Sequence, residues 1–426
     1  MTISISDVKN AIVYESLNDT MPKRTVSEHA NIINETNTQM IFRSSWRWIY
    51  FPISCNDNVL IPYPDLIQKC IDGGYSFELR SKFITELKST NPDLLIVAAI
   101  PAQKIDKTLD VNEFTGETFN ATQLASMIFD PRTVGINKTP QEFQTVMAQY
   151  TDGYYPDISN PTVQNLILGW CKKAIDSGVD GIWIDLLYSQ AINIFQLAGN
   201  NINNIGVQNS YSAANKLIDD IHAYGLSQGK TIYVGTWLIP VSEFINRYGM
   251  AAPNVDFVTM SPSPTEVLNR VFEIDKWNDI ITSYNSAFGN KVKFFTFIDW
   301  AAGSGSQIAN FSQKLTTEQQ NKFLIDSKTF FDGLGITFIY PVHGGVMGSS
   351  PATTPRLNNG TTRYDSIVFN NYETIKQLMT GEVIPPIIDT GVGWFRKKTC
   401  ITPTTCLPNW GLVGIGGLLA YLILKK

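Results

Sequence analysis

Two aspartates, Asp185 and Asp299, each end an otherwise apolar run of residues. The run before Asp185 begins at Gly181, shortly after a predicted helix end at Ser177-Gly178. An uninterrupted apolar run of this length is typical of a strand buried on both faces, as in parallel sheets covered by helices. A carboxylate at the carboxyl end of such a strand lies where α/β barrels place their reacting groups. The two aspartates are therefore the first candidates for chemistry.

Polar and aromatic residues also follow the other apolar runs, and one long loop adds a tyrosine. If these runs are strands of one barrel, carboxylates, an arginine, a histidine and several aromatic rings converge on one cavity. Such a collection suits carbohydrate, because sugar rings stack on aromatic faces while their hydroxyls bond to charged side chains. The predicted substrate-binding residues are Glu15, Arg43, Tyr155, Tyr188, Trp237, Glu266, Trp300 and His343.

Cleavage of a glycosidic bond needs two carboxyl groups, one protonated as general acid and one ionised as nucleophile or base. Asp185 and Asp299 form the predicted catalytic pair, because the fourth and seventh strands lie on roughly opposite sides of a barrel mouth. An apolar setting raises the pKa of one acid, and neighbouring tryptophans at 183, 237 and 300 would supply that setting.

Several of these residues also have a structural interpretation. Asp185 could cap the next helix or pair with an arginine, and Glu266 follows Pro264-Thr265 as in a helix start, where an acid favours the helix dipole. His343 stands before two glycines and could be held in a turn. Arg43 is expected to face the cavity, since an unpaired arginine at the end of a buried strand would be costly elsewhere.

Eight short apolar runs occur in series, and most are followed by a helical pattern. Strands that alternate with helices indicate parallel βαβ units, and eight of them predict a (β/α)₈ TIM barrel with insertions. The longest insertion, 103–160, separates the third and fourth strands and is expected at the mouth of the barrel. The predicted strands are 11–15, 40–43, 94–100, 181–187, 231–237, 255–260, 292–300 and 336–340; the predicted helices are 26–34, 64–72, 162–177, 212–228, 264–287, 316–334 and 372–379, with 141–149 in the insertion.

The two ends of the chain differ. The first ten residues show no signal-peptide pattern, whereas 409–426 is apolar until Lys425-Lys426 and begins near Trp410. That length and those flanks predict a transmembrane-like anchor, with the barrel at 1–381 on the non-cytoplasmic side and 382–408 as a linker. The alternative is an apolar helix buried in an oligomer or a particle. We expect a membrane-anchored protein whose bulk is extracellular or on a virion or cell surface.

Composition excludes several classes of function. With 33 Lys+Arg against 38 Asp+Glu and no basic stripe, nucleic acid is not an expected partner. The five cysteines form no CxxC pair and lie near no histidine cluster, so no metal and no other cofactor is predicted. Cys400 and Cys406 could form a disulfide outside the cytosol or remain thiols. Lyase or aldolase chemistry lacks a strand-end lysine, and phosphate binding lacks a glycine-rich loop that opens a helix.

The segment from Tyr155-Pro156-Asp157 to Asn160-Pro161, followed by Gly178-Val179-Asp180-Gly181 and Asp185, resembles glycoside-hydrolase-like (β/α)₈ barrels. Its fourth strand is more distantly similar to the Asp-Gly-x-Asp-x-Asp-x-Glu motif of chitinase-type enzymes. Here Trp183 stands at the middle aspartate position and Leu187 at the catalytic glutamate, which argues against chitinase chemistry. The resemblance implies a barrel that cleaves or binds sugars and names no glycan.

Two functions remain open from the sequence. The first is a surface-exposed glycosidase that hydrolyses O-glycosidic bonds of a polysaccharide or glycoprotein glycan with two carboxylates. The second is a non-catalytic carbohydrate-binding surface or virion protein on the same barrel. Sequons begin at Asn34, Asn120, Asn137 and Asn310 and would allow glycosylation of an exported domain.

Overall fold

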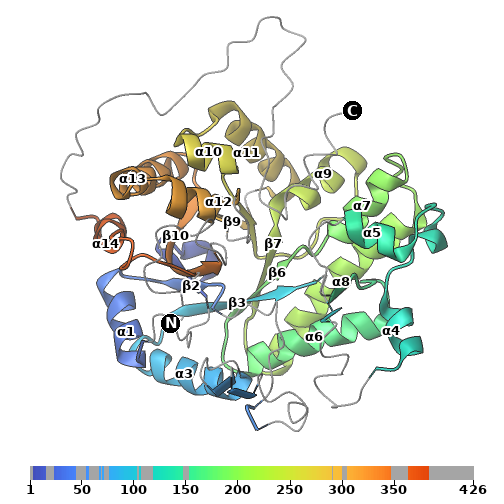
Figure 1. Ribbon diagram of the computed structural model, residues 1–426, viewed down its shortest axis with the longest axis horizontal. Coiled ribbons are helices and arrows are strands. Elements are labelled where there is room, and N and C mark those ends of the chain that lie inside the picture. Colours follow the sequence, from blue (N-terminus) through green and yellow to red (C-terminus); the bar gives the residue numbers. More distant parts are fainter. Residues whose placement is uncertain are drawn as a thin grey trace, which may run out of the picture.

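The computed structural model is a (β/α)₈ barrel (Figure 1). It describes residues 3–15, 24–44, 54–56, 67–68, 70–71, 76–102, 105–106, 119–146, 153–289, 291–299, 305–346 and 363–382. Trp300, the predicted linker and anchor, and Cys400 and Cys406 lie outside this set. No helix among the described residues is long and apolar enough to cross a membrane, and the anchor at 409–426 stays a prediction.

Eight parallel strands form the barrel, and the first pairs with the last. In the pair of the first and last strands, which closes the barrel, Ala11 lies opposite Ile339. In the pair of the third and fourth barrel strands, Pro101 lies opposite Asp185. The predicted (β/α)₈ barrel is confirmed. The strands are β1 (Ala11–Tyr14), β2 (Met40–Phe42), β3 (Leu95–Pro101), β6 (Gly181–Asp185), β7 (Tyr233–Trp237), β8 (Phe257–Met260), β9 (Lys293–Phe297) and β10 (Thr337–Val346).

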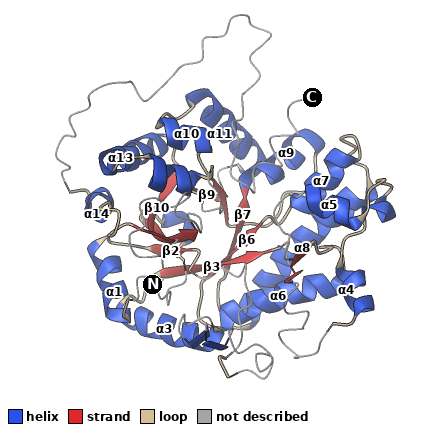
Figure 2. Ribbon diagram, in the orientation of Figure 1, coloured by secondary structure: helices blue, strands red, loops and turns tan. Residues whose placement is uncertain are grey.

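Helices surround the strands on the outside (Figure 2). Buried apolar side chains from both layers form one continuous core, as the double-sided burial of parallel strands requires. The outer layer contains α1 (Val26–Glu35), α3 (Phe77–Thr90), α6 (Pro161–Asp176), α7 (Ser189–Leu197), α8 (Ile205–Ser227), α9 (Leu238–Tyr248), α10 (Pro264–Asn269), α11 (Ile274–Phe288), α12 (Gln307–Ala309), α13 (Thr317–Gly333) and α14 (Tyr372–Thr380).

The helices differ from the sequence prediction in several respects. The helix predicted at 264–287 is two helices, because Arg270 ends α10 in the left-handed region at a φ of 57°. Helices α3, α7 and α9 were not predicted, since α3 is rich in polar residues and α9 starts directly after a strand and contains Pro240. Most of the helix predicted at 64–72 lies outside the described residues.

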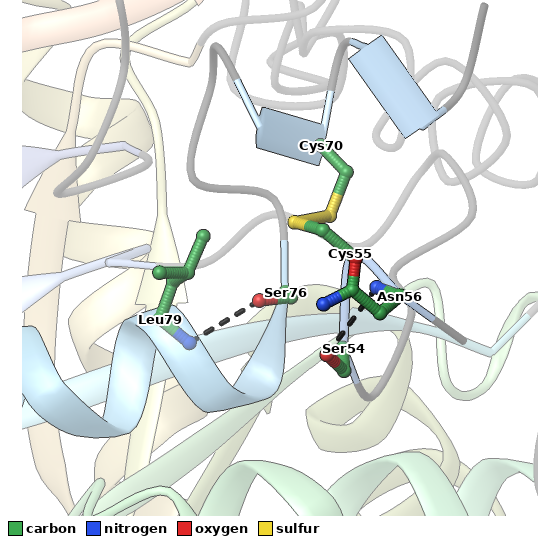
Figure 3. The surroundings of a disulfide bond; sticks show 6 residues. All are labelled: Ser54, Cys55, Asn56, Cys70, Ser76 and Leu79. Carbon is green, nitrogen blue, oxygen red and sulfur yellow. Dashed lines mark hydrogen bonds between the residues drawn. A yellow bond between two sulfur atoms is a disulfide. The ribbon is translucent and has the colours of Figure 1, made fainter. Parts of the chain in front are cut away.

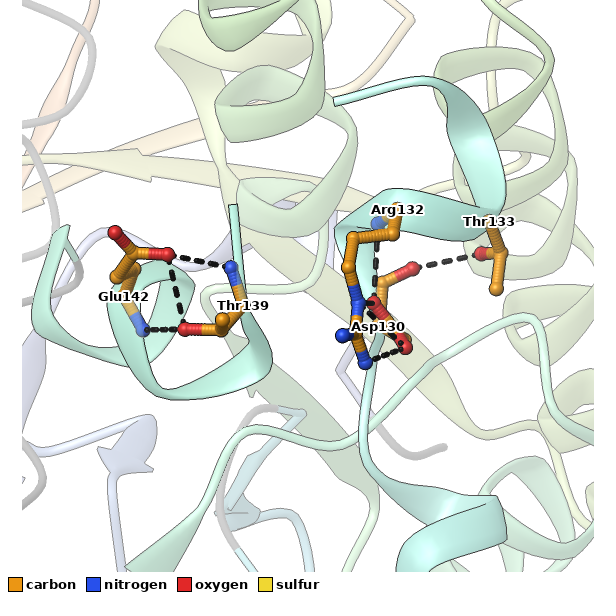
Figure 4. Close-up of polar contacts among 5 residues, drawn as sticks. All are labelled: Asp130, Arg132, Thr133, Thr139 and Glu142. Atoms are coloured by element: carbon orange, nitrogen blue, oxygen red, sulfur yellow. Dashed lines mark hydrogen bonds and ion pairs between the residues drawn. The ribbon is translucent and has the colours of Figure 1, made fainter. Parts of the chain in front are cut away.

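The insertion after β3 contains α4 (Ala121–Met127), α5 (Pro140–Val146) and an antiparallel pair, β4 (Ile105–Asp106) with β5 (Gly153–Tyr154). Figure 4 shows how its polar residues start these helical turns. Thr139 and Glu142 form a reciprocal cap before α5, with the Thr139 amide donating to Glu142 Oε2 over 2.6 Å. Asp130 accepts from the Arg132 side chain and from its backbone amide at the start of a short 3₁₀ turn, Pro131–Val134. These contacts stabilise the start of each turn.

A disulfide joins Cys55 and Cys70 in the connection between β2 and α3 (Figure 3). The next element, α3, begins at Ser76, whose Oγ accepts from the Leu79 amide over 3.2 Å. The sequence analysis did not predict this pair, because the two cysteines are 15 residues apart and lack a recognised spacing. Cys171 is buried in the core.

One glycine in the barrel wall is required by close packing. A Cβ on Gly235 of β7 would lie 2.2 Å from the Phe257 ring of β8. The neighbouring strands can approach and bury that ring only because position 235 carries no side chain. The same closely packed wall holds the strand ends that carry the candidate site.

Candidate active site

Four charged residues from four strand ends lie together in the barrel. Glu15 follows β1, Arg43 follows β2, Asp185 ends β6 and Asp299 follows β9. Arg43 Nη2 is 2.7 Å from Glu15 Oε1, and Arg43 Nη1 is 3.5 Å from Asp299 Oδ1. All four are buried, so their charges depend on one another and not on bulk water.

Aromatic rings hold the Arg43 guanidinium. Its central carbon lies 5.5 Å from the Trp183 ring centre and 5.8 Å from that of Phe297. Trp183 is itself fixed, because its indole Nε1 donates to Thr259 Oγ1 over 3.0 Å inside the barrel. Arg43 also has a φ of 59°, a conformation that costs a bulky residue free energy and that often occurs at functional sites. The packing below Arg43 maintains this conformation.

Asp185 is held by a tryptophan on the next strand. Trp237 Nε1 donates to Asp185 Oδ1 over 2.6 Å, and the Trp237 ring is stacked on Phe297 and edge-on to Trp183. Burial raises the pKa of Asp185 to about 7, with a further increase from the negative charge of Asp299; Trp237 and Arg43 act in the opposite direction. Asp185 therefore keeps its proton at pH values where most carboxyl groups are ionised.

The two aspartates lie in different electrostatic surroundings. Asp299 is 3.5 Å from the Arg43 guanidinium, whereas burial raises the pKa of Asp185. An acid that can donate a proton and a neighbouring carboxylate that can accept one or attack carbon are the components of general acid and nucleophilic catalysis. The structure thus brings Glu15, Arg43, Asp185, Asp299 and Trp237 into one site.

His343 belongs to a neighbouring polar cluster between β10 and β1. Its Nδ1 is 3.0 Å from Asp365 Oδ2 on β11 (Arg363–Asp365), and Arg24 Nη2 is 2.8 Å from the same oxygen. Burial opposes the charge on Asp365, but the hydrogen bond with His343 and the charge of Arg24 lower its pKa overall. The backbone links this cluster to the site, because the Glu15 amide donates to the His343 carbonyl over 3.1 Å.

Sequence reasoning missed two members of that cluster. Arg24 and Asp365 follow no apolar run that ends near them, and 22 residues separate Asp365 from His343. Only the antiparallel return of β11 along β10 places Asp365 opposite His343. The Phe297 ring below Arg43 was missed as well, although it lies two residues before Asp299 in a predicted strand.

Three predicted substrate-binding residues lie buried in other contacts. Tyr155 packs edge-on to Phe143 of the insertion. The Tyr188 hydroxyl donates to Asn215 of α8 over 2.7 Å, and the Tyr188 ring packs beside Tyr211. A fourth predicted residue, Trp300, lies outside the described residues.

Glu266 is the third of these residues, and it forms a buried ion pair with Lys276. Its carboxylate also accepts from the Trp277 indole over 2.9 Å and from the Ser263 and Glu273 amides. Although burial opposes the charge, Lys276 and these amides lower the pKa of Glu266. The helix-start interpretation of Glu266 agrees with its cap at Ser263.

The described residues contain no group of three or more His, Cys, Asp or Glu side chains that could hold a metal ion. Arg43 lies 3.5 Å from Asp299, and its positive charge also acts on Asp185.

No protein-family model and no curated protein sequence matches the chain. The similar solved structures are glycoside hydrolases with barrels. The chain matches a gamma-CGTase from alkalophilic Bacillus clarkii at 12% identity and a TM-score of 0.44, covering 88% of this chain but only 56% of that one. The glycoside hydrolase domain of PelA from Pseudomonas aeruginosa matches at 10% identity and a TM-score of 0.42, covering 82% of this chain and 96% of that one. A Nostoc punctiforme debranching enzyme matches at 13% identity and a TM-score of 0.48, covering 90% of this chain and 81% of that one.

These similarities identify no sequence family, and TM-scores this low carry no argument about the family, the individual residues or the substrates of this chain. Function must therefore be inferred from the site itself.

Proposed function

We propose that the protein is a glycoside hydrolase in which Asp185 is the general acid and Asp299 is the nucleophile or base. The observation that carries this proposal is that Asp185 and Asp299 are both buried at strand ends of one barrel, with a raised pKa at Asp185 and the Arg43 guanidinium 3.5 Å from Asp299. Glycosidic bond hydrolysis requires one protonated and one ionised carboxyl group on the two sides of the scissile bond.

Asp185 is suited to protonate the leaving oxygen, because its pKa of about 7 keeps a substantial protonated fraction at neutral pH. In the proposed step the Asp185 proton moves to the glycosidic oxygen and the bond from that oxygen to the anomeric carbon breaks. The oxygen takes the electron pair and leaves as a hydroxyl group. Burial is also useful here, because it strengthens electrostatic interactions with the developing charge.

Asp299 is suited to the second role because Arg43 favours its charged form at 3.5 Å. Its carboxylate either bonds to the anomeric carbon, forming an intermediate that water hydrolyses, or removes a proton from the attacking water. Arg43 is shared with Glu15, which helps to hold the guanidinium between the two strand ends. Trp237, half-buried beside Asp185, supports sugar binding because its ring offers a stacking surface.

The test is hydrolysis of a glycan panel by the full chain and by three carboxylate variants. Asp185→Asn and Asp299→Asn each keep the size of the side chain, and both should lose about 10²-fold or more of the rate. Asp279→Asn on the exposed side of α11 is the matched control and should cleave like the wild type. Equal rates in wild type and Asp185→Asn would remove Asp185 from the mechanism.

The alternative is a carbohydrate-binding protein without catalysis. One observation favours it: Arg43 is paired with both Glu15 and Asp299, as in a structural ion-pair network. This alternative predicts glycan binding in a glycan-array experiment with no release of reducing sugar, and binding that Asp185→Asn leaves unchanged.

We also propose that the barrel acts outside the cytosol. The Cys55–Cys70 disulfide supports this location, because structural disulfides persist in oxidising compartments. Attachment to a membrane by 409–426 remains a prediction, and microscopy of the full chain against the chain truncated after Glu382 tests it.

A further inference from the structure

Trp237 has a contact that a sugar-stacking ring alone would not need. Its indole Nε1 is 2.6 Å from Asp185 Oδ1, whereas its ring is stacked at 5.5 Å on Phe297 and lies 5.3 Å from Trp183. The two aromatic neighbours restrict the ring plane, and the ring plane sets the direction of the N–H bond. The direction of that bond in turn selects which oxygen of Asp185 faces Trp237.

An indole nitrogen can only donate a hydrogen bond. Asp185 Oδ1 must therefore be the acceptor in this contact whether the carboxyl group is protonated or ionised. When Asp185 carries a proton, an O–H on Oδ1 would compete with the indole N–H for the same side of that oxygen. An acidic hydrogen on Oδ2 avoids that competition.

We propose that Trp237 is a positioning residue that fixes the Asp185 carboxyl group with Oδ2 as its proton-bearing oxygen. This inference rests on the proposed function, since it assigns the atom from which the glycosidic oxygen receives its proton. A general acid is effective only when its hydrogen lies within bonding reach of the leaving oxygen. A carboxyl group that rotates freely would present the hydrogen only part of the time.

The other groups around Asp185 do not replace this contact. Asp299 faces it from β9 and Arg43 from β2, while Glu15 on β1 acts through Arg43. On the β3 side, Pro101 is its strand partner and has no titratable group. The Leu186 backbone amide also donates to the Asp185 carboxyl group, whereas Trp237 Nε1 donates to it from a side chain.

The test substitutes Trp237→Phe, which keeps an aromatic ring and removes the N–H group. Because a donated hydrogen bond favours the ionised acid, its loss should move the basic limb of the kcat/KM profile to higher pH by about one unit. The plateau of kcat should fall by at least about tenfold, because the proton is no longer held on Oδ2.

Trp277→Phe is the matched control. Trp277 Nε1 also donates to a buried carboxylate, Glu266 Oε1, over 2.9 Å, but that pair lies in the helical layer on α10 and α11. This variant should lose stability and keep the wild-type pH profile. If both variants keep the wild-type profile, or if both shift it equally, Trp237 does not position Asp185.

A second measurement works without catalysis. The difference in unfolding free energy between Asp185→Asn and the wild type, followed against pH, reports the titration of Asp185 in the folded protein. In the Trp237→Phe background its midpoint should move to higher pH, and an unchanged midpoint would overturn the proposal. If no glycan is cleaved by the wild type but this midpoint moves, the proposed hydrolase activity fails while the Trp237 contact stands.

Discussion

Replacing Asp185 by asparagine should make the protein more stable at neutral pH while it abolishes hydrolysis. Asparagine keeps the shape of the side chain, and its carbonyl oxygen can still accept from the Trp237 indole. It carries no charge that burial would penalise. Asp185 would then be a residue whose carboxyl group serves function but lowers the stability of the fold, as is common in active sites.

The size of the effect follows from the two pKa values of Asp185. In the folded protein the value is about 7, and the ordinary value of 3.8 applies to the unfolded chain. Between these pH values the folded state holds a proton that the unfolded state has lost, so stability falls as the pH rises. The difference between the two pKa values corresponds to roughly 4 kcal/mol of stability. The wild type loses this stability between pH 3.8 and 7, whereas the asparagine variant does not.

Chemical denaturation of both proteins at several pH values measures this effect. The free energy of unfolding of Asp185→Asn relative to the wild type should increase steadily from about pH 4 to about pH 7 and then stay constant. Asp279→Asn, exposed on α11, should show no such increase. A difference that is flat over this range would mean that Asp185 is ionised throughout and cannot be the general acid.

Three further predictions concern stability and modification. Glu266→Gln should cost about 3 to 5 kcal/mol, because it leaves the Lys276 charge buried without its partner, and denaturant unfolding measures the loss. Reduction of the Cys55–Cys70 disulfide should lower stability by about 3 kcal/mol, measured by unfolding with and without reductant; an unchanged midpoint would refute it. If the chain is exported through a glycosylating pathway, peptide mass spectrometry should find a glycan on exposed Asn137 and none on Asn310, whose buried side chain donates to the Pro264 carbonyl. A glycan on folded Asn310 would contradict that placement.

The sequence predicted the barrel because burial on both faces leaves a strong local signal. Each strand could be predicted from the composition of its own apolar run and from the helical pattern that follows it, as with the run from Gly181 to Asp185. The positions of Asp185 and Asp299 at the carboxyl ends of strands followed from the same pattern. Helix α9 was missed because its neighbouring Trp237 and its internal Pro240 obscure the helical period.

The sequence by itself therefore determined the eight strands and which residues stand at their ends. Only the tertiary structure decided which of those residues touch. The bridge from Arg43 to Glu15 and Asp299, and the hydrogen bond from Trp237 to Asp185, join strands that are far apart in the chain. The physical reason is that the residue types of a segment predict whether it is buried. A contact between two side chains depends instead on strand register and barrel closure, which the whole chain determines.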